Sequence, residues 1–233
     1  MRAPPVTAPY AVNLDLRRRP VLLVGAGRVA ARKLDGLLAT GATITVVAPE
    51  AGPEVEALAD AGTVRWHRRP YERGEVASYR LAVTATDDPA TNARVAADGE
   101  AANVFVNSAD DPDNCSFILP AVIRRGDLQL SVSTNGHSPA FASWLRRRLA
   151  AEITDAHGAT LALVAEVRAE VRQRLGTSEI DGWDDAIDDG LVDLVASGHL
   201  DAARHRLRRA LGLSEPAIPT PDPRPHATTR STP

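Results

Sequence analysis

The chain has 233 residues, 44% hydrophobic and 24% charged, a composition typical of a globular protein with one large domain or two to three small ones. The net charge of −3 gives no general attraction to nucleic acid, and no apolar run approaches the ~20 residues that span a bilayer. The single cysteine, Cys115, excludes an internal disulfide framework and a thiolate metal cluster within one chain. We expect a cytosolic protein with no bound metal, membrane or nucleic-acid partner.

The first predicted strand runs directly into a glycine-rich turn. Val21–Val24 is a continuous apolar run, as in a central parallel strand, and a G-x-G-x-x-A sequence follows it. Such a turn brings backbone N–H groups and the N-terminus of the next helix to the pyrophosphate of a dinucleotide. Helical spacing continues to Leu38, and Gly41 is placed to end that helix. The predicted cofactor-binding residues of this turn are Gly25, Ala26, Gly27, Arg28, Val29 and Ala30.

Strands and helices alternate over about residues 10–112. A second strand, Thr43–Ala48, precedes Glu50, which lies where an acidic group would meet the ribose hydroxyls or would be only a solvated loop charge. This alternation predicts a parallel sheet with helices on both faces, and ligands bind beyond the carboxyl ends of such strands. The remaining elements are predicted as helix Pro53–Ala61, strand Val64–His67, strand Leu81–Ala85, helix Thr91–Ala102 and strand Val104–Asn107. The strand ends add Thr84, Ala85, Thr86, Asp87 and Asn107 to the predicted cofactor site.

Residues 113–150 have a different character. The segment Cys115–Val122 is apolar, Gly126-Asp127 is a turn signal, and Leu128–Ser133 alternates as a strand does. A helix is predicted over Ala140–Ala150, after Pro139. One strand pair and one helix are too few to bury a core, so we expect this segment to pack on a second copy and form a homodimer.

Residues 151–213 are predicted to be helical, and the two ends of the chain to be disordered. The helices are expected at Leu161–Leu175, near Trp183–Ser197 and near Asp201–Leu211. Residues 1–9 are rich in proline and alanine, and residues 214–233 carry too much proline to form a core. The fold class is therefore α/β: a Rossmann-like parallel-sheet domain (10–112), a small α+β dimerisation domain (113–150), a helical domain (151–213) and a tail (214–233).

Five segments in register resemble the precorrin-2 dehydrogenase family of sirohaem biosynthesis, which includes bifunctional dehydrogenase/ferrochelatase members. They lie in roughly residues 10–150 and read VGAGRVAARK from Val24, TATDD from Thr84, VNSAD from Val106, SFILPA from Ser116 and SVSTNGHSPA from Ser131. The resemblance implies oxidation of precorrin-2 to sirohydrochlorin with NAD as the hydride acceptor. It leaves open whether the chain also inserts Fe²⁺ to give sirohaem.

The same resemblance suggests roles for individual residues. The motif places a catalytic aspartate at Asp110, as the acid/base group next to the nicotinamide. His137 lies in the loop before the predicted helix, where it would assist metal insertion or be a solvated side chain. The substrate is a tetrapyrrole rich in carboxylates, so arginines are expected around it. The candidate substrate-binding residues are Arg124, Arg125, Ser133, Thr134 and Ser138.

A second function from another class fits the sequence less well. An NAD-binding regulatory module that senses redox state would bind the dinucleotide without turnover and use the helical block as a partner or DNA surface. No helix-turn-helix pattern is evident in that block, and the chain is acidic overall. NAD is favoured over NADP because no basic pair directly follows the second strand, and Glu50 would repel a 2′-phosphate.

Overall fold

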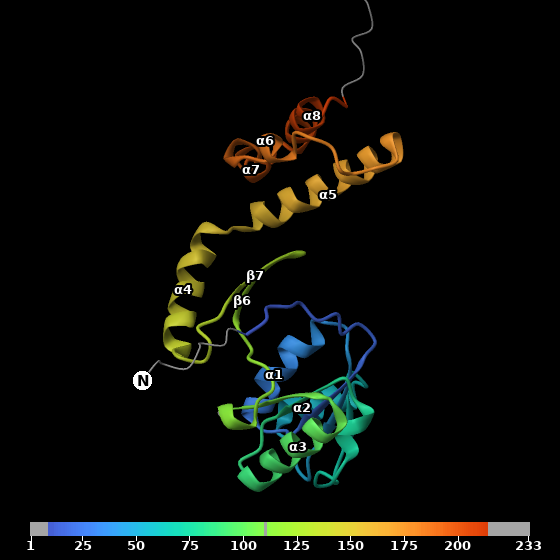
Figure 1. The fold of residues 1–233 in the computed structure, drawn as a ribbon, viewed down its shortest axis with the longest axis vertical. Coiled ribbons are helices and arrows are strands. Elements are labelled where there is room, and N and C mark those ends of the chain that lie inside the picture. The colour runs from blue at the N-terminus through green and yellow to red at the C-terminus, as the bar shows by residue number, and fades with distance from the viewer. Residues whose placement is uncertain (1–8, 110, 214–233) are drawn as a thin grey trace, which may run out of the picture. The chain divides into compact units, whose positions relative to one another are not determined.

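The apolar runs of the first half of the chain form the strands of one parallel sheet (Figure 1). The computed structural model describes residues 9–109 and 111–213. The strand order is β3-β2-β1-β4-β5, and all four pairings are parallel. The strands are β1 (Pro20–Val24), β2 (Thr43–Val47), β3 (Arg65–His67), β4 (Leu81–Thr84) and β5 (Phe105–Ser108). The order reverses direction at β1, so the edge of the sheet beyond β1 is the switch point where doubly wound folds bind ligands.

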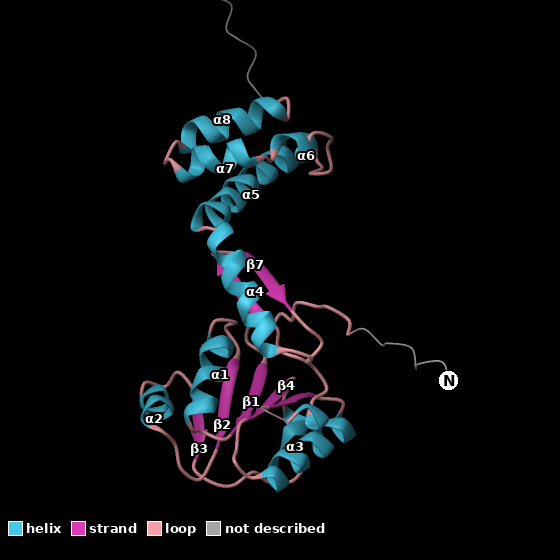
Figure 2. Cartoon of the chain, turned by 90° about the vertical axis from the view of Figure 1, so that its left-hand side faces the viewer, coloured by secondary structure: helices cyan, strands magenta, loops and turns pink. Residues whose placement is uncertain are grey.

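Helices cover both faces of this sheet, as expected for strands that are apolar on both sides (Figure 2). On one face, Val21 and Leu23 of β1 pack with α1 (Arg28–Leu38) and α2 (Pro53–Asp60). On the other face, Leu22 and Val24 pack with α3 (Pro89–Ala102) and the 3₁₀ turn η1 (Glu75–Ser78). The predicted Rossmann-like class is confirmed, and element boundaries differ from the prediction by one or two residues.

The described residues divide into two compact units, one within residues 1–121 and 131–145 and one within 122–130 and 146–233. The predicted strand pair is present, but most of the apolar segment Cys115–Val122 lies before it, because β6 spans Ala121–Arg125 and pairs with β7 (Leu128–Val132). The residues before Ala121 are bound to β5 instead. The Ser116 N–H donates to the Val106 carbonyl at 2.8 Å, and Pro120 has no N–H to offer a ladder. Helix α4 (Pro139–Glu152) follows β7, as predicted.

The second unit is built mainly from helices that share one apolar core. These are α5 (Asp155–Leu175), α6 (Trp183–Ala186), α7 (Asp189–Ala196) and α8 (Leu200–Ala210). The single helix predicted over Trp183–Ser197 is wrong, because the chain is extended at Ile187 and Asp188. The Asp188 carboxylate caps α7 by accepting from the Leu191 N–H at 2.9 Å, so the acidic residue starts a new helix rather than continuing the old one.

The predicted terminal tails, residues 1–9 and 214–233, lie outside the described residues apart from Pro9. Among residues 9–109 and 111–213, no helix combines the length and the apolar character needed to cross a bilayer.

Candidate functional site

The glycine turn after β1 forms an open cradle at the switch point of the sheet. Gly25 has a φ of +100°, and a Cβ there would stand 2.4 Å from the Ala85 carbonyl oxygen. The turn is therefore pressed against the end of β4, and a glycine is required. Gly27 differs, because a Cβ on it would meet nothing within 4 Å. Backbone can be approached closely at Gly27, as contact with a phosphate requires.

Helix α1 begins at this cradle with an uncapped N-terminus. Gly27 is its N-cap and provides no side-chain hydrogen bond, and the first turn contains no acidic residue. The first intrahelical backbone bond near this end runs from the Ala31 N–H to the Gly27 carbonyl at 3.0 Å. The preceding N–H groups of the first turn are thus available to an anion, with the favourable end of the helix dipole behind them. The residues present fit the pyrophosphate of a dinucleotide.

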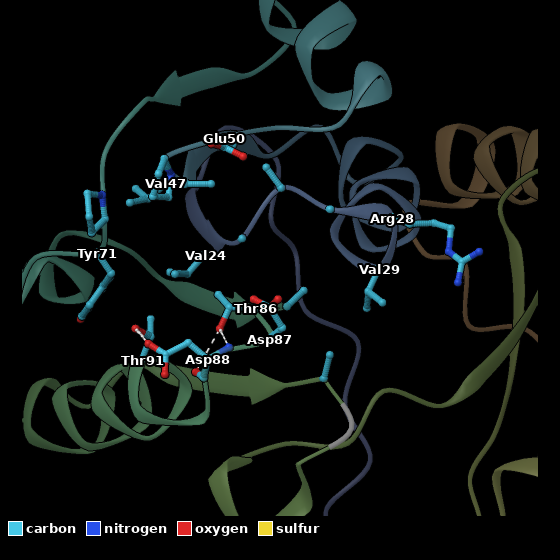
Figure 3. A pocket seen from close by; sticks show the side chains of 18 residues that line it. Val24, Arg28, Val29, Val47, Glu50, Tyr71, Thr86, Asp87, Asp88 and Thr91 are labelled. Atoms are coloured by element: carbon cyan, nitrogen blue, oxygen red, sulfur yellow. Dashed lines mark hydrogen bonds between the residues drawn. The ribbon is translucent and has the colours of Figure 1, made fainter.

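A cleft of about 750 Å³ opens from this cradle (Figure 3). The volume is within the range of cofactor pockets. Its lining includes, for each of the five strands, residues of the strand end or of the loop after it, together with Arg28 and Val29 of α1 and Thr91 of α3. Predicted cofactor residues in the lining are Gly25, Ala26, Gly27, Arg28, Val29, Glu50, Ala85, Thr86 and Asp87.

Carboxylates dominate the charge of the cleft. Among the described residues, Glu50, Asp87 and Asp88 line it, and Arg28 is the one cation in the lining. Figure 3 shows the Arg28 guanidinium pointing away from these carboxylates. Asp88 caps α3, and hydrogen bonds from the Thr91 hydroxyl and the Ala90 N–H hold the pKa of its carboxyl below the ordinary value. A negative lining favours ribose hydroxyls over an additional phosphate.

The loop after β4 is fixed by its own hydrogen bonds. The Thr86 hydroxyl lies 2.8 Å from Asn92 Oδ1 and accepts from the Asp88 N–H at 3.2 Å. Asn92, which is buried, donates in turn to the Thr86 carbonyl at 3.1 Å. Thr86 thus lines the cleft, and its side-chain hydrogen bonds also order the loop. This part of the cleft wall is therefore preformed.

Three predicted cofactor residues support the cleft without lining it. Ala30 is fully buried between α1 and the sheet. The buried Thr84 hydroxyl donates to Ser108 Oγ at 2.9 Å, which ties β4 to β5. The Asn107 amide donates to the Phe117 carbonyl at 2.9 Å and holds the segment after β5. Sequence position at a strand end could not distinguish these inward side chains from the exposed ones.

The predicted catalytic aspartate, Asp110, lies outside the described residues, and its neighbour in sequence, Ala109, lines the cleft. His137 is exposed in a turn closed by its N–H and the Thr134 carbonyl at 3.0 Å.

Near the end of β5, burial raises the pKa of the Cys115 thiol. In the described part of the chain, no three His, Cys, Asp or Glu side chains gather as metal ligands would.

The substrate-binding candidates are distributed between the two units. In the first unit, the Thr134 hydroxyl donates to the Ser138 carbonyl at 3.1 Å, Ser133 Oγ accepts from the Asn135 N–H at 3.3 Å, and Ser138 Oγ accepts from the Phe141 N–H at 3.2 Å. These bonds shape the loop before α4. In the second unit, Arg124 is exposed and bonds Gln129 Oε1 at 3.1 Å.

Arg125 has a structural role that the sequence did not indicate. Its guanidinium donates to the carbonyls of Ile153 at 3.0 Å and Ala150 at 3.1 Å, and lies 3.3 Å from the Asp155 carboxylate. It therefore closes the C-terminus of α4 beside the start of α5, where backbone carbonyls need donors.

One end of the cleft is lined by residues that carry no sequence motif. Pro70, Tyr71 and Thr91 line it, and Figure 3 places Tyr71 and Thr91 at the end remote from Arg28 and Val29. Tyr71 follows β3 in a loop without a recognised motif. Its only sequence signal is an aromatic residue shortly after a strand end, which is too weak to identify a site.

Comparison with known proteins identifies the family of the chain. Residues 12–121 match the family described as "Putative NAD(P)-binding", and residues 125–152 match "Sirohaem biosynthesis protein central". A sirohaem synthase of Methylobacillus flagellatus is 35% identical over 86% of this chain and 43% of its own length. One of Methylococcus capsulatus is 37% identical over 85% of this chain and 42% of its own length. The chain thus spans about two fifths of the length of these relatives.

A solved structure described as "SirC, precorrin-2 dehydrogenase" has the same fold over nearly its full length. It superposes with a TM-score of 0.62 and 26% identity, covering 87% of this chain and 97% of that protein. The two family matches, the synthase relatives and this structure agree with the cradle and cleft described above. The chain carries an NAD(P)-binding domain and belongs to the precorrin-2 dehydrogenase family of sirohaem biosynthesis, which includes the corresponding region of sirohaem synthases.

Proposed function

We propose that this chain oxidises precorrin-2 to sirohydrochlorin with NAD as hydride acceptor. The observation that carries the proposal is the uncapped α1 cradle at the head of a carboxylate-lined cleft, in a chain that matches a precorrin-2 dehydrogenase over 97% of that protein. The bound nicotinamide supplies hydride acceptance. NAD is preferred to NADP because Glu50, which follows β2, repels a 2′-phosphate and no basic pair follows that strand.

The protein's own residues hold the cofactor and move the proton. The first-turn N–H groups of α1 bind the pyrophosphate, and Glu50 accepts from ribose hydroxyls. Loss of a hydride and a proton extends conjugation of the macrocycle, so a base is needed beside the reacting carbon. Asp110, which follows the cleft residue Ala109, takes this proton. His137, Arg124, Arg125, Ser133, Thr134 and Ser138 stay predictions as substrate-side residues.

Metal insertion is a second proposed activity of the same chain. Binding Fe²⁺ in sirohydrochlorin releases two pyrrole protons, and a carboxylate such as Asp110 is a suitable acceptor. We also place the protein in the cytosol, as a homodimer whose contact domain is residues 113–150. Phe141 and Trp144 support the dimer, because their rings stand 5.4 Å apart and are each about half exposed on α4.

The test is anaerobic turnover of enzymatically generated precorrin-2, followed by absorbance with NAD and separately with NADP. We expect sirohydrochlorin to form with NAD, and Asp110→Asn to abolish turnover while it still binds NAD. Asp113→Asn, which changes an exposed carboxylate in the 3₁₀ turn η2 (Pro112–Asn114), is the matched control and should turn over normally. NAD binding without turnover by the unmodified chain would contradict the dehydrogenase and favour the regulatory module.

Two additions extend the same experiment. When Fe²⁺ or Co²⁺ is added after the oxidation, metal insertion into sirohydrochlorin should be faster than the nonenzymatic rate if the chain is also a chelatase. Sedimentation of the protein should give a dimer, and Trp144→Asp should give a monomer.

A further inference from the structure

At the end of the cleft remote from Arg28 lies Tyr71, an aromatic side chain whose hydroxyl is hydrogen-bonded to a carboxylate on α3. Tyr71 is 6% exposed and packs with Val24, Val47 and Val76 in the core of the α3 face. Its hydroxyl donates to Asp98 Oδ2 on α3 at 2.9 Å. The hydroxyl is thus directed toward α3, while Tyr71 is among the residues that line the cleft.

Asp98 holds the whole turn that carries this ring. Its Oδ2 also accepts from the Gly74 N–H at 2.7 Å, and Arg73 Nε stands 3.8 Å from its other oxygen. Gly74 has a φ of +79°, so the turn after Tyr71 adopts a conformation that favours glycine. Burial, together with the bond to Asp98, raises the pKa of Tyr71 and keeps its hydroxyl neutral. One carboxylate therefore fixes both the ring and the loop.

The topology of the sheet says which half of a dinucleotide meets this ring. The strand order β3-β2-β1-β4-β5 puts Pro70 and Tyr71, which follow β3, on the β2 side of the phosphate cradle. Ala109, which follows β5, lies on the opposite side. Such sheets consist of two mononucleotide-binding halves that meet at the switch point, and the acidic residue expected on the adenosine ribose, Glu50, follows β2. The adenosine half therefore lies on the β2–β3 side, and the other half faces the second nucleotide.

From this placement we propose that Tyr71, with Pro70, forms the adenine-binding wall of the cleft, and that Asp98 is a positioning residue which holds Tyr71 in that wall. The inference rests on the proposed dinucleotide function. Adenine is flat and largely apolar on its faces, and aromatic side chains bind bases by packing against those faces.

Calorimetric titration with ADP-ribose and with nicotinamide mononucleotide separates the two halves of the cofactor. We expect Tyr71→Ala to weaken ADP-ribose binding at least about tenfold, the loss typical of a removed aromatic platform. Mononucleotide binding should stay within twofold in this variant. Tyr71→Phe keeps the ring and should bind ADP-ribose nearly as the unmodified chain does. Tyr79→Ala is the matched control, since Tyr79 packs on the same core cluster and does not line the cleft.

The role of Asp98 is tested by rescue. Asp98→Ala should weaken ADP-ribose binding and leave mononucleotide binding unchanged, while Asp98→Asn keeps an acceptor oxygen and should recover most of the affinity. Equal loss of both ligands, or no rescue by asparagine, would overturn the positioning role.

A labelling experiment on the unmodified protein does not depend on how variants fold. ADP-ribose with an azido group on its adenine ring, activated by light, should label the tryptic peptide of residues 69–73. Labelling confined to other peptides overturns the adenine wall even where ADP-ribose binds. If the unmodified chain binds neither ADP-ribose nor NAD, the proposed dinucleotide function fails as well.

Discussion

Gly25 and Gly27 occupy the same turn, yet the structure predicts opposite consequences for the same substitution. A methyl group at Gly25 would lie 2.4 Å from the Ala85 carbonyl oxygen and 2.8 Å from its carbon, on a backbone with φ of +100°. Positive φ in a residue with a Cβ costs about 1–3 kcal/mol. Displacing a packed backbone costs about 1–3 kcal/mol more. Gly25→Ala should therefore lower the free energy of unfolding by about 2–6 kcal/mol, a large part of the roughly 5–15 kcal/mol typical of a domain.

Gly27→Ala is the matched control within the turn. Its φ is −81°, and a Cβ there meets nothing within 4 Å. Its effect on the free energy of unfolding should stay below about 1 kcal/mol, the scale of a changed helix N-cap. Affinity for NAD should nevertheless fall sharply, because the added methyl occupies the space through which a phosphate approaches the backbone.

Urea unfolding, followed by circular dichroism, and calorimetric titration with NAD measure the two effects separately. Gly25→Ala should shift the unfolding midpoint, and Gly27→Ala should change only the binding isotherm. The reasoning is refuted if Gly25→Ala unfolds at the midpoint of the unmodified chain, or if Gly27→Ala binds NAD with unchanged affinity.

Three further predictions concern packing, a helix end and pH. Gly99→Ala would place a Cβ 2.3 Å from Val106 Cγ2 and force α3 away from β5. The free energy of unfolding in urea should fall by about 1–3 kcal/mol, and an unchanged midpoint would contradict the close packing. Arg125→Ala leaves two backbone carbonyls at the end of α4 without their donor and should lower the free energy of unfolding by about 1–3 kcal/mol. The thermal transition should then occur at a lower temperature, and Arg125→Lys should restore only part of the loss. Burial would raise the pKa of Glu75, but the hydrogen bonds from Arg69 and a backbone N–H outweigh it, and the pKa lies below its ordinary value. The stabilisation from ionised Glu75 is therefore present above the ordinary carboxyl pKa and is lost as the pH falls through the lowered pKa. Glu75→Gln should make the free energy of unfolding depend less on pH on the acid side. An unaltered pH dependence would show that the Arg69–Glu75 pair contributes nothing to stability.

The sequence determined the sheet and the cradle because both are encoded locally. Apolar runs of four or five residues predict buried strands wherever they lie, and the spacing of Gly25, Gly27 and Ala30 is itself the turn that leads from strand to helix. The acidic residues at the strand ends were found for the same reason, since parallel strands deliver their carboxyl ends to one edge.

Only the tertiary structure decided which polar groups face the cleft and which hold it together. Thr84 and Asn107 follow the same sequence rule as Thr86 and Asp87, but their side chains are directed inward to Ser108 and to the Phe117 carbonyl. The break at Ile187 was missed because the apolar spacing of a helix continues across it.

Tyr71 illustrates the limit most clearly. Its partner Asp98 lies 27 residues further along the chain, on a different element. Periodicity reports whether one face of an element is buried, but it carries no information about which distant group receives a hydrogen bond. That choice depends on how β3, η1 and α3 come together, and this is settled only when the whole α3 face of the sheet packs.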